Sequence, residues 1–406
     1  MLQPGALQGV KVIDWSVFQV GPYSAAMLAD LGADVIHVEE PGRGDALRGI
    51  KTLFGVPLML NGRHLLFEEH NRSKRGITVD LRREEGREVI YRLAKESDVF
   101  LTNYRQAAVA RMGMDYDTLR QLNPRLVYAR ASGFGFEGPD KDSPSLDLVA
   151  QARSGAMMAS GEEGSPPTFL SLGMGDRVTS YLIAFGVVTA LLAREKLGVG
   201  QRVDVSQLQA MALIQGNGLM PAFTMGNSIP RHNRLKPPRN PLYNSYRCQD
   251  GRWIVMAAIQ GGRYWGNFCR TMGHPELEHD PRFVDEEARM RHREELVRIL
   301  DEAFATRPAQ DWIEAMRESA DMPIAVANRL IDLAEDEQIL ANDYILNWDH
   351  PAMGKIKFPG FAVKFTETPA ALQGPAPELG QHTEEVMLGL GYTWEDIGAL
   401  KDQGII

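Results

Sequence analysis

Short β-branched runs alternate with helical stretches through residues 10–135, and this alternation restricts the fold more than any other feature of the chain. The strand-like runs are VKVIDW, ADVIHVE, GITVDL, DVFLTNY and RLVYARAS, and residues 22–31, 84–96 and 106–121 have helical periodicity. Strands that alternate with helices form a parallel sheet with helices packed on its faces. Pro22 suits the first turn of a helix, where its missing N–H is not needed. We therefore expect an α/β fold with a parallel sheet.

The amino-acid composition changes near residue 221, and this change predicts a domain boundary. At 406 residues, the chain exceeds the usual size of a single hydrophobic core. The run PAFTMGNSIPRHNRLKPPRNP is rich in Pro, Asn and basic residues, and predicts a linker. Beyond it, LYNSYRC and RWIVMAAI flank Gln249-Asp250-Gly251, which is typical of a hairpin. Helical patterns follow at about 285–305, 309–319 and 332–341. We expect a large α/β domain at residues 1–220, a smaller α+β domain at 225–325, and a return to the large domain at 326–406.

Bulk properties exclude several classes of protein. The net charge of -9 argues against capture of nucleic acid, which depends on dense Lys/Arg surfaces. Cys248 and Cys269 are too few for a disulfide framework and lack the spacing of a zinc site. The N-terminus does not resemble a secretory signal, and the most apolar stretch, residues 181–193, is too short to span a bilayer. We expect a cytoplasmic protein without a membrane partner.

The turn after the first strand, SVFQVGP, holds one glycine, whereas a dinucleotide fingerprint needs three. This composition disfavours a permanently bound NAD or FAD. The sequence also lacks the phosphate-binding loop, the H-E-x-x-H zinc motif and the G-x-S-x-G serine motif. We expect neither a resident cofactor nor a metal.

The segment LGMGDRV places Asp176 between a glycine-containing turn and a long apolar helix. An aspartate at this position is a natural N-cap, since its oxygens accept free backbone N–H groups. It is also a candidate nucleophile, helped by backbone donors and by glycines that let a substrate approach. The two interpretations are compatible.

The run GMGDRVTSYLIAFGVVTALLAREKLGVGQRVDVSQLQA resembles the family III CoA transferases, a group that includes formyl-CoA and carnitine CoA transferases. In that family a Gly-Asp pair precedes a helix, a Leu-Leu-x-Arg stretch and a Gly-x-Gly-Gln-x-Val-Asp-Val-Ser strand. This chain has Gly175-Asp176, residues 191–194 and residues 198–206 at those places. Further segments agree in order with the family, at residues 18–22, 31–39, 42–45, 71–75, 98–104, 111–113, 122–125, 147–155 and 380–386.

The resemblance implies a Rossmann-like large domain, a smaller domain and an interlocked homodimer. It also implies that CoA moves from an acyl-CoA donor to a free carboxylic acid through a mixed anhydride on Asp176, with CoA as substrate and product. Gln19 would donate to the acyl oxygens, and Asp147 aligns with an acidic position near the nucleophile. Candidate contacts to CoA are Lys74, Arg75, Asn103, Arg111 and Met112.

The arginines of the sequence favour one class of acceptor acid. A dicarboxylic acid would suit a site with arginine anchors for a second carboxylate, for which the candidates are Arg43, Arg48, Arg153 and Arg177. Residues 230–245 contain no glycine, whereas the formyl-CoA relatives have a glycine-rich loop there, so a lid of that kind is not expected.

Two alternatives stay open. An α-methylacyl-CoA racemase would share this fold but needs a histidine where the chain has Leu146, and leucine cannot accept a proton. A CoA-binding subunit of a hetero-oligomeric transferase would need a second polypeptide for activity.

Overall fold

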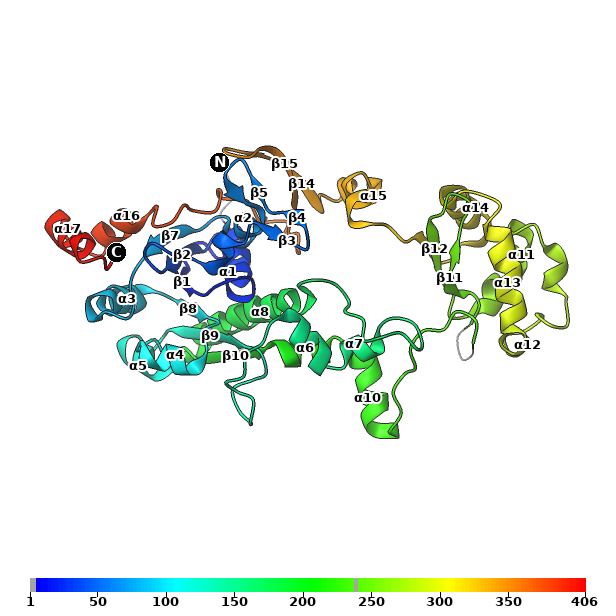
Figure 1. Cartoon of the computed structure of the whole chain (residues 1–406), viewed down its shortest axis with the longest axis horizontal. Coiled ribbons are helices and arrows are strands. Elements are labelled where there is room, and N and C mark those ends of the chain that lie inside the picture. The colour runs from blue at the N-terminus through cyan, green and yellow to red at the C-terminus, as the bar shows by residue number, and fades with distance from the viewer. Residues whose placement is uncertain (1–4, 237–239) are drawn as a thin grey trace. The chain divides into compact units, whose positions relative to one another are not determined.

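Six parallel strands form the central sheet, in the order β10-β9-β8-β1-β2-β7 (Figure 1). Their bounds are β1 Lys11–Trp15, β2 Asp34–Glu39, β7 Arg75–Thr78, β8 Val99–Thr102, β9 Val127–Ser132 and β10 Arg202–Ser206. The first five coincide with the five strand-like runs, so the prediction of an α/β fold with a parallel sheet is confirmed. The computed structural model describes residues 5–236 and 240–406.

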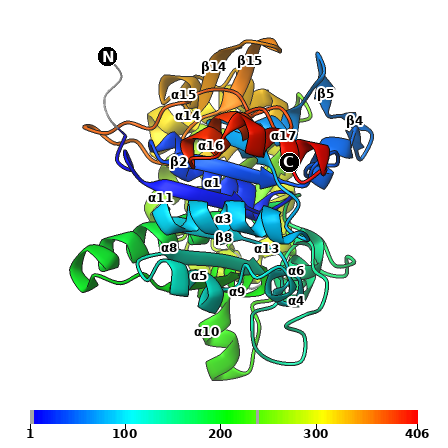
Figure 2. The same cartoon turned by 90° about the vertical axis from the view of Figure 1, so that its left-hand side faces the viewer.

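Alternate residues of each strand point to opposite faces of the sheet. Val12 packs with α1 (Val20–Asp30) and α8 (Met174–Leu197) on one face. Ile13 packs on the other face, where the residues come from α3 (Glu84–Glu96), α5 (Tyr116–Leu122), α16 (Thr383–Gly389) and α17 (Trp394–Asp402). Helix α16, red in Figure 2, contacts the edge strand β7, where the N–H of Thr78 donates to the hydroxyl of Thr383 at 3.0 Å. Residues near both ends of the chain therefore pack together in the core on this face of the sheet.

The helix expected over residues 106–121 is two helices, α4 (Gln106–Arg111) and α5. Gly113 separates them with a φ of +67°, a conformation that ends a helix. Asp115 then caps α5 by accepting the N–H of Thr118 at 3.0 Å. The helical periodicity of the sequence continues across this break, so the break could not be predicted from it.

Helix α8 is longer than the apolar stretch from which it was predicted. It runs for 24 residues, and among the described residues it is the one helix long and apolar enough to cross a membrane by length and composition. The expectation that this segment is too short to span was therefore wrong. The inner face of α8 packs against α1, β9 and β10 within the core, as core helices of soluble proteins also do.

The chain divides into two compact units, one comprising Met1–Ser160, Pro167–Ile229 and Asp343–Ile406, and the other Gly161–Pro166 and Pro230–Asn342. The expected boundary at residue 325 is wrong, because it cuts the strand β13 (Ile324–Val326), which pairs with β12 (Trp253–Ala257). Residues 216–225 are the helix α10 (Gly216–Met225), so the linker begins after Gly226 rather than at residue 221. Part of it, residues 237–239, lies outside the described residues.

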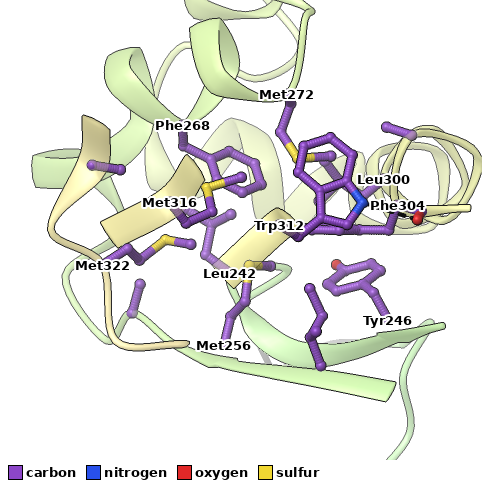
Figure 3. Packing of buried hydrophobic residues seen from close by; sticks show 14 of the residues in the cluster. Leu242, Tyr246, Met256, Phe268, Met272, Leu300, Phe304, Trp312, Met316 and Met322 are labelled. Atoms are coloured by element: carbon purple, nitrogen blue, oxygen red, sulfur yellow. Dashed lines mark hydrogen bonds between the residues drawn. The ribbon is translucent and has the colours of Figure 1, made fainter. Parts of the chain in front are cut away.

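The smaller unit has its own sheet and core. The predicted hairpin is present as β11 (Tyr243–Arg247) and β12, with Arg247 opposite Trp253 and Gly251 at a φ of +78°. The core under this sheet includes Tyr246, Phe304 and Trp312, which Figure 3 shows close together. The helices are α11 (Gly261–Thr271), α12 (Glu286–Arg291), α13 (Arg293–Phe304), α14 (Ala309–Ala320) and α15 (Glu337–Ala341).

Further elements of the larger unit lie between the strands of its sheet or follow its last strand, β10. They are α2 (Leu65–Asn71), α6 (Asp147–Arg153), α7 (Ala156–Ala159), α9 (Gln207–Leu213) and the hairpin of β14 (Ile345–His350) and β15 (Gly354–Pro359).

Candidate active site

The carboxyl ends of the parallel strands bring three polar side chains to one edge of the sheet. Gln19 follows β1, Asn103 follows β8 and Gln207 follows β10. The chain adds strands to one side of β1 up to β7 and then continues with β8 on the other side, so β1 and β8 form the switch point of the sheet. Ligands of open α/β sheets bind at this place.

Side chains hold the loop between β1 and α1 by its backbone. Asn103 donates to the carbonyl oxygen of Val17 at 2.8 Å and accepts its N–H at 2.9 Å. Asp45 accepts the N–H of Phe18 at 2.9 Å, and Phe18 has a φ of +62°. A bulky residue adopts this conformation only where its surroundings enforce it. The loop that ends at Gln19 is therefore fixed from outside.

Two glycines shape the turn that leads into α8. Gly173 has a φ of +74°, and a Cβ there would lie 3.0 Å from Nε2 of Gln19. At Gly175 a Cβ would lie 3.0 Å from Oδ1 of Asp147 and 3.2 Å from Cγ of Met211. A side chain at either position would crowd these neighbours, so the glycines let Gln19 and Asp147 approach the start of α8.

Asp147, the first residue of α6, caps α8 from outside that helix. Its Oδ1 accepts the N–H of Gly175 at 2.6 Å and that of Asp176 at 3.3 Å, and its Oδ2 accepts the N–H of Gly173 at 3.0 Å. Gln151 donates to Oδ2 at 2.8 Å and holds the carboxylate in place. Asp147 thus occupies the capping position that the sequence allowed for Asp176.

The carboxylate of Asp176 is consequently free of the capping role. Gln207 donates from Nε2 to its Oδ1, and no described residue donates to its Oδ2. Burial raises the pKa of Asp176 to about 7, and the nearby negative charge of Asp147 acts in the same direction. The hydrogen bond from Gln207 and the charge of Arg177 oppose this rise. A carboxylate with a raised pKa and an uncommitted oxygen is a candidate nucleophile.

Gln19 lies beside this turn, as the contact between its amide and Gly173 indicates. Its side chain makes no hydrogen bond to any described residue. The structure therefore brings together the three predicted site residues Gln19, Asp147 and Asp176, with the amide of Gln19 available to a ligand.

The environment of Lys74 contradicts the prediction that this residue contacts CoA. Its side chain is fully buried, and its ammonium group donates to Oδ2 of Asp14 at 2.8 Å, the carbonyl oxygen of Pro22 at 2.7 Å and Oδ1 of Asn71 at 2.8 Å. All three of its protons are used inside the protein. Burial alone would raise the pKa of Asp14, but Lys74 and His37 hold it below its usual range. Lys74 thus belongs to a structural network under α1.

The other predicted CoA contacts lie in different environments. Arg75 begins β7, at the outer edge of the sheet, and pairs with Asp34 at 2.6 Å and Glu385 at 3.0 Å. Asn103 uses its amide on Val17, as described above. Arg111 is exposed at the end of α4 and pairs with no described residue, whereas Met112 is half-buried against the core. Arg111 is the predicted contact that is best placed to meet an anion.

Most of the arginines considered as anchors for a second carboxylate already have acidic partners. Arg48 pairs with Glu39 at 2.8 Å, Arg153 with Asp140 at 2.6 Å and Arg177 with Glu69 at 2.8 Å. Arg43 is exposed and has no partner among residues 5–236 and 240–406. The arginine argument for a dicarboxylic acid therefore loses its main support.

Sequence reasoning missed Gln207 and Asp45. Gln207 directly follows the matched strand β10, so its place at the carboxyl edge of the sheet was a usable signal. Asp45 was recognised only as part of a motif, and its bond to Phe18 depends on tertiary structure. Among the described residues, no three His, Cys, Asp or Glu side chains form a group that could hold a metal ion.

Comparison with known proteins agrees with this geometry. The sequence profile of CoA-transferase family III matches residues 7–383. The (R)-2-hydroxy-4-methylpentanoate CoA-transferase of Clostridioides difficile is 34% identical over 98% of this chain and 99% of the relative. The succinyl-CoA–D-citramalate CoA-transferase of Chloroflexus aurantiacus is 30% identical over 99% of this chain and 98% of the relative.

A solved structure extends the comparison to the fold. The crystal structure of a CaiB/BaiF family protein from Brucella suis superposes with a TM-score of 0.84 at 28% identity, covering 96% of this chain and all of the other. Its match spans both compact units of the chain. The chain therefore belongs to CoA-transferase family III, whose members are enzymes that act on CoA thioesters.

Proposed function

We propose that this enzyme transfers CoA from an acyl-CoA donor to a small free carboxylic acid through a mixed anhydride on Asp176. The observation that carries the proposal is the state of the Asp176 carboxylate. One oxygen accepts from Gln207, the other has no donor among the described residues, and burial raises the pKa of the group to about 7. Such a carboxylate is less well solvated than one in water, which favours attack on an energetic thioester.

The chemistry balances without a metal or redox group. In the first step the carboxylate oxygen of Asp176 attacks the thioester carbonyl carbon, the C–S bond breaks and CoA leaves as a thiolate. The acceptor carboxylate then attacks the aspartyl carbonyl, which releases the donor acid and forms an acceptor–aspartyl anhydride. The retained CoA thiolate attacks the acceptor carbonyl of that anhydride, which yields the new acyl-CoA and regenerates Asp176.

Gln19 supports the first step as a hydrogen-bond donor. Its amide lies at Gly173, at the start of the turn that carries Asp176, and no described residue uses it. An amide donor directed at an oxygen that gains negative charge stabilises the transition state. Asp147 would act through Asp176, by capping α8 and by raising the pKa of the nucleophile.

CoA enters this scheme as substrate and product. Arg111 is the proposed phosphate contact, because its guanidinium is exposed and unpaired among the described residues. The relatives described above carry a branched 2-hydroxy acid and succinyl-CoA in their names. Succinyl-CoA and a 2-hydroxyacyl-CoA are therefore the first donors to offer, against a panel of free monocarboxylic and dicarboxylic acids.

A homodimer is part of the proposal, and α8 supports it. Its outer face exposes Tyr181, Phe185, Val188 and Leu192 at helical spacing, and Phe185 is 71% exposed. Helix α10 also exposes Phe223, at 81%. Apolar faces of this kind on a soluble protein mark interaction surfaces. Light scattering after size exclusion should give the mass of two chains, and Phe185→Glu should lower it to that of one.

Replacement of Asp176 by Asn tests the proposal. Asn keeps the shape and the bond to Gln207 but cannot form the anhydride, so CoA transfer should fall at least about 10³-fold while acyl-CoA binding persists. Asp142→Asn, an exposed change, serves as the control. Turnover by Asp176→Asn at the wild-type rate would refute the proposal.

A further inference from the structure

His70 contacts both halves of the candidate site. It lies on α2, its side chain is 1% exposed, and its Nδ1 is 3.1 Å from the carbonyl oxygen of Phe18. On the other side of the ring, Nε2 is 3.4 Å from a terminal guanidinium nitrogen of Arg177. Phe18 immediately precedes Gln19, and Arg177 immediately follows Asp176. One imidazole therefore bridges the two segments that carry the proposed donor and the proposed nucleophile.

The two partners of His70 determine its tautomer. A backbone carbonyl can only accept, so Nδ1 must carry a proton, and a guanidinium can only donate, so Nε2 must be bare. The imidazole is therefore neutral, with its single proton on Nδ1. Burial lowers the pKa of His70 well below its usual value, and the positive charges of Arg177, Lys74 and Arg72 act in the same direction.

The groups around the imidazole are consistent with this state. Glu69 is the acidic neighbour, with its Oε2 3.9 Å from Nε2, and it is already paired with Arg177. The ring of Tyr23 packs edge-on against the imidazole, with the centroids 6.0 Å apart.

The contact from His70 is one of two that hold Phe18 in its conformation. Its φ of +62° is costly for an aromatic residue, on the order of 1–2 kcal/mol. Asp45 holds its N–H at 2.9 Å and His70 holds its carbonyl oxygen, so the peptide groups on both sides of the residue are fixed. Loss of the His70 contact frees the second peptide group, which leads directly to Gln19.

Arg177 is held by the same helix. Glu69 and His70 are consecutive residues of α2, and both contact the Arg177 guanidinium, which also lies 3.8 Å above the ring of Tyr23 on α1. The start of α8 is thereby fixed to α2 and α1 directly after Asp176.

We propose that His70 is a positioning residue that sets the distance between the Gln19 amide and the Asp176 carboxylate by bonding Phe18 and Arg177 at once. This inference rests on the proposed function, since it assigns His70 an effect on that reaction. His70 itself is shielded by the residues it bonds and takes no part in proton transfer.

Three substitutions separate the two contacts. His70→Phe removes both, His70→Asn keeps a donor at the place of Nδ1, and His70→Gln keeps an acceptor near the place of Nε2 but no donor towards Phe18. His64→Asn is the matched control, because His64 is also buried and bonds two backbone groups, at Phe67 and Ile50.

Steady-state kinetics with succinyl-CoA, or with the best donor in the panel, provides the first readout. We expect His70→Phe to lower kcat about 10- to 100-fold with a change in KM of less than about 3-fold, because misplaced reacting groups affect the chemical step. His70→Asn, which keeps the donor to Phe18, and His70→Gln, which keeps an acceptor for Arg177, should each recover part of the loss, and His64→Asn should keep the wild-type kcat. A wild-type kcat for folded His70→Phe, or equal losses for His70→Asn and His70→Phe, would overturn the inference.

The tautomer provides a readout that does not depend on activity. In protein labelled with ¹⁵N-histidine, the His70 signals, assigned by comparison with His70→Asn, should show a protonated Nδ1 and a bare Nε2 from about pH 6 to 8. A cationic ring or a proton on Nε2 would contradict the bridge. An inactive wild-type enzyme would instead overturn the proposed function, whereas an active enzyme indifferent to His70→Phe overturns only the role of His70.

Discussion

The backbone N–H of Asp176 donates to Oδ1 of Asp147 at 3.3 Å, so the helix that carries the proposed nucleophile is capped by a second carboxylate. Asp147 therefore affects both the stability of the helix and the ionisation of the proposed nucleophile. The cap stabilises the start of α8, and its negative charge makes Asp176 harder to ionise. Both the pH dependence of the reaction and that of the stability should therefore reflect the pair Asp147 and Asp176.

The pH dependence of the reaction should follow the ionisation of Asp176. Only the carboxylate form attacks, so kcat/KM should rise with pH through about 7 and level off above it. Asp147→Asn removes the like charge, lowers the pKa of Asp176 and should move this rise to lower pH. Initial rates across a pH series measure the shift, with Asp142→Asn as the control. A rise at the same pH in Asp147→Asn would exclude the coupling.

The stability of the protein should depend on the same ionisation. The folded pKa of Asp176 lies above its unfolded value of 3.8, so the unfolded chain ionises first and stability is lost as pH rises from about 4 to about 7. Asp176→Asn has no such loss. Its Tm should match the wild type near the low end of this window and exceed it by a few °C above pH 7. Scanning calorimetry against pH checks this, and a constant Tm difference would contradict it.

Gly173→Ala and Gly198→Ala form a matched pair at the two ends of α8. Their φ angles are +74° and +75°, so each substitution strains the backbone by about 1 kcal/mol. A Cβ at Gly198 would meet nothing within 4 Å, whereas one at Gly173 would press on Gln19. Thermal melts should show similar losses, but only Gly173→Ala should lower kcat, by about 10-fold or more. Equal activity of the two variants would argue against the role of the Gln19 contact.

Substitutions of Lys74 and Arg111 should have opposite effects on stability and on acyl-CoA affinity. Lys74→Met leaves Asp14 and Asn71 buried without their partner, which should destabilise the protein by about 3–5 kcal/mol with little effect on acyl-CoA affinity. Arg111→Ala should leave stability unchanged and weaken acyl-CoA binding by about 10-fold, because a charge-assisted bond is lost. Denaturant titration and calorimetric binding measure the two effects, and the reverse pattern would restore Lys74 as the CoA contact.

The sheet could be predicted from the sequence because its signal is local. Val12 and Ile13 alternate between two cores, and this period-two pattern is repeated in the next strands. The break at Gly113 escaped prediction, because a single left-handed residue interrupts a helix without disturbing its apolar periodicity. The end of the smaller unit was predicted wrongly for another reason. The pairing of β13 with β12 joins segments far apart in the sequence.

The site was predictable where a residue's place on the chain decides its role. Gln19 and Asp176 lie in turns that a parallel sheet brings to one edge, and the turn glycines marked the second of them. Lys74 was not predictable in this way. It resembles a phosphate ligand in the sequence, and only the folded chain places Asp14, Pro22 and Asn71 around its ammonium group.

The most direct test of the central claim is to trap the acyl group on the enzyme. Wild-type protein mixed with succinyl-CoA, or with the best donor in the panel, and no acceptor acid should cleave about one thioester per site and keep the CoA thiolate bound. Hydroxylamine should then convert the anhydride to a hydroxamate, which peptide mass spectrometry would locate at Asp176. Steady CoA transfer with an unmodified Asp176 peptide, or with the label on another residue, would contradict the account.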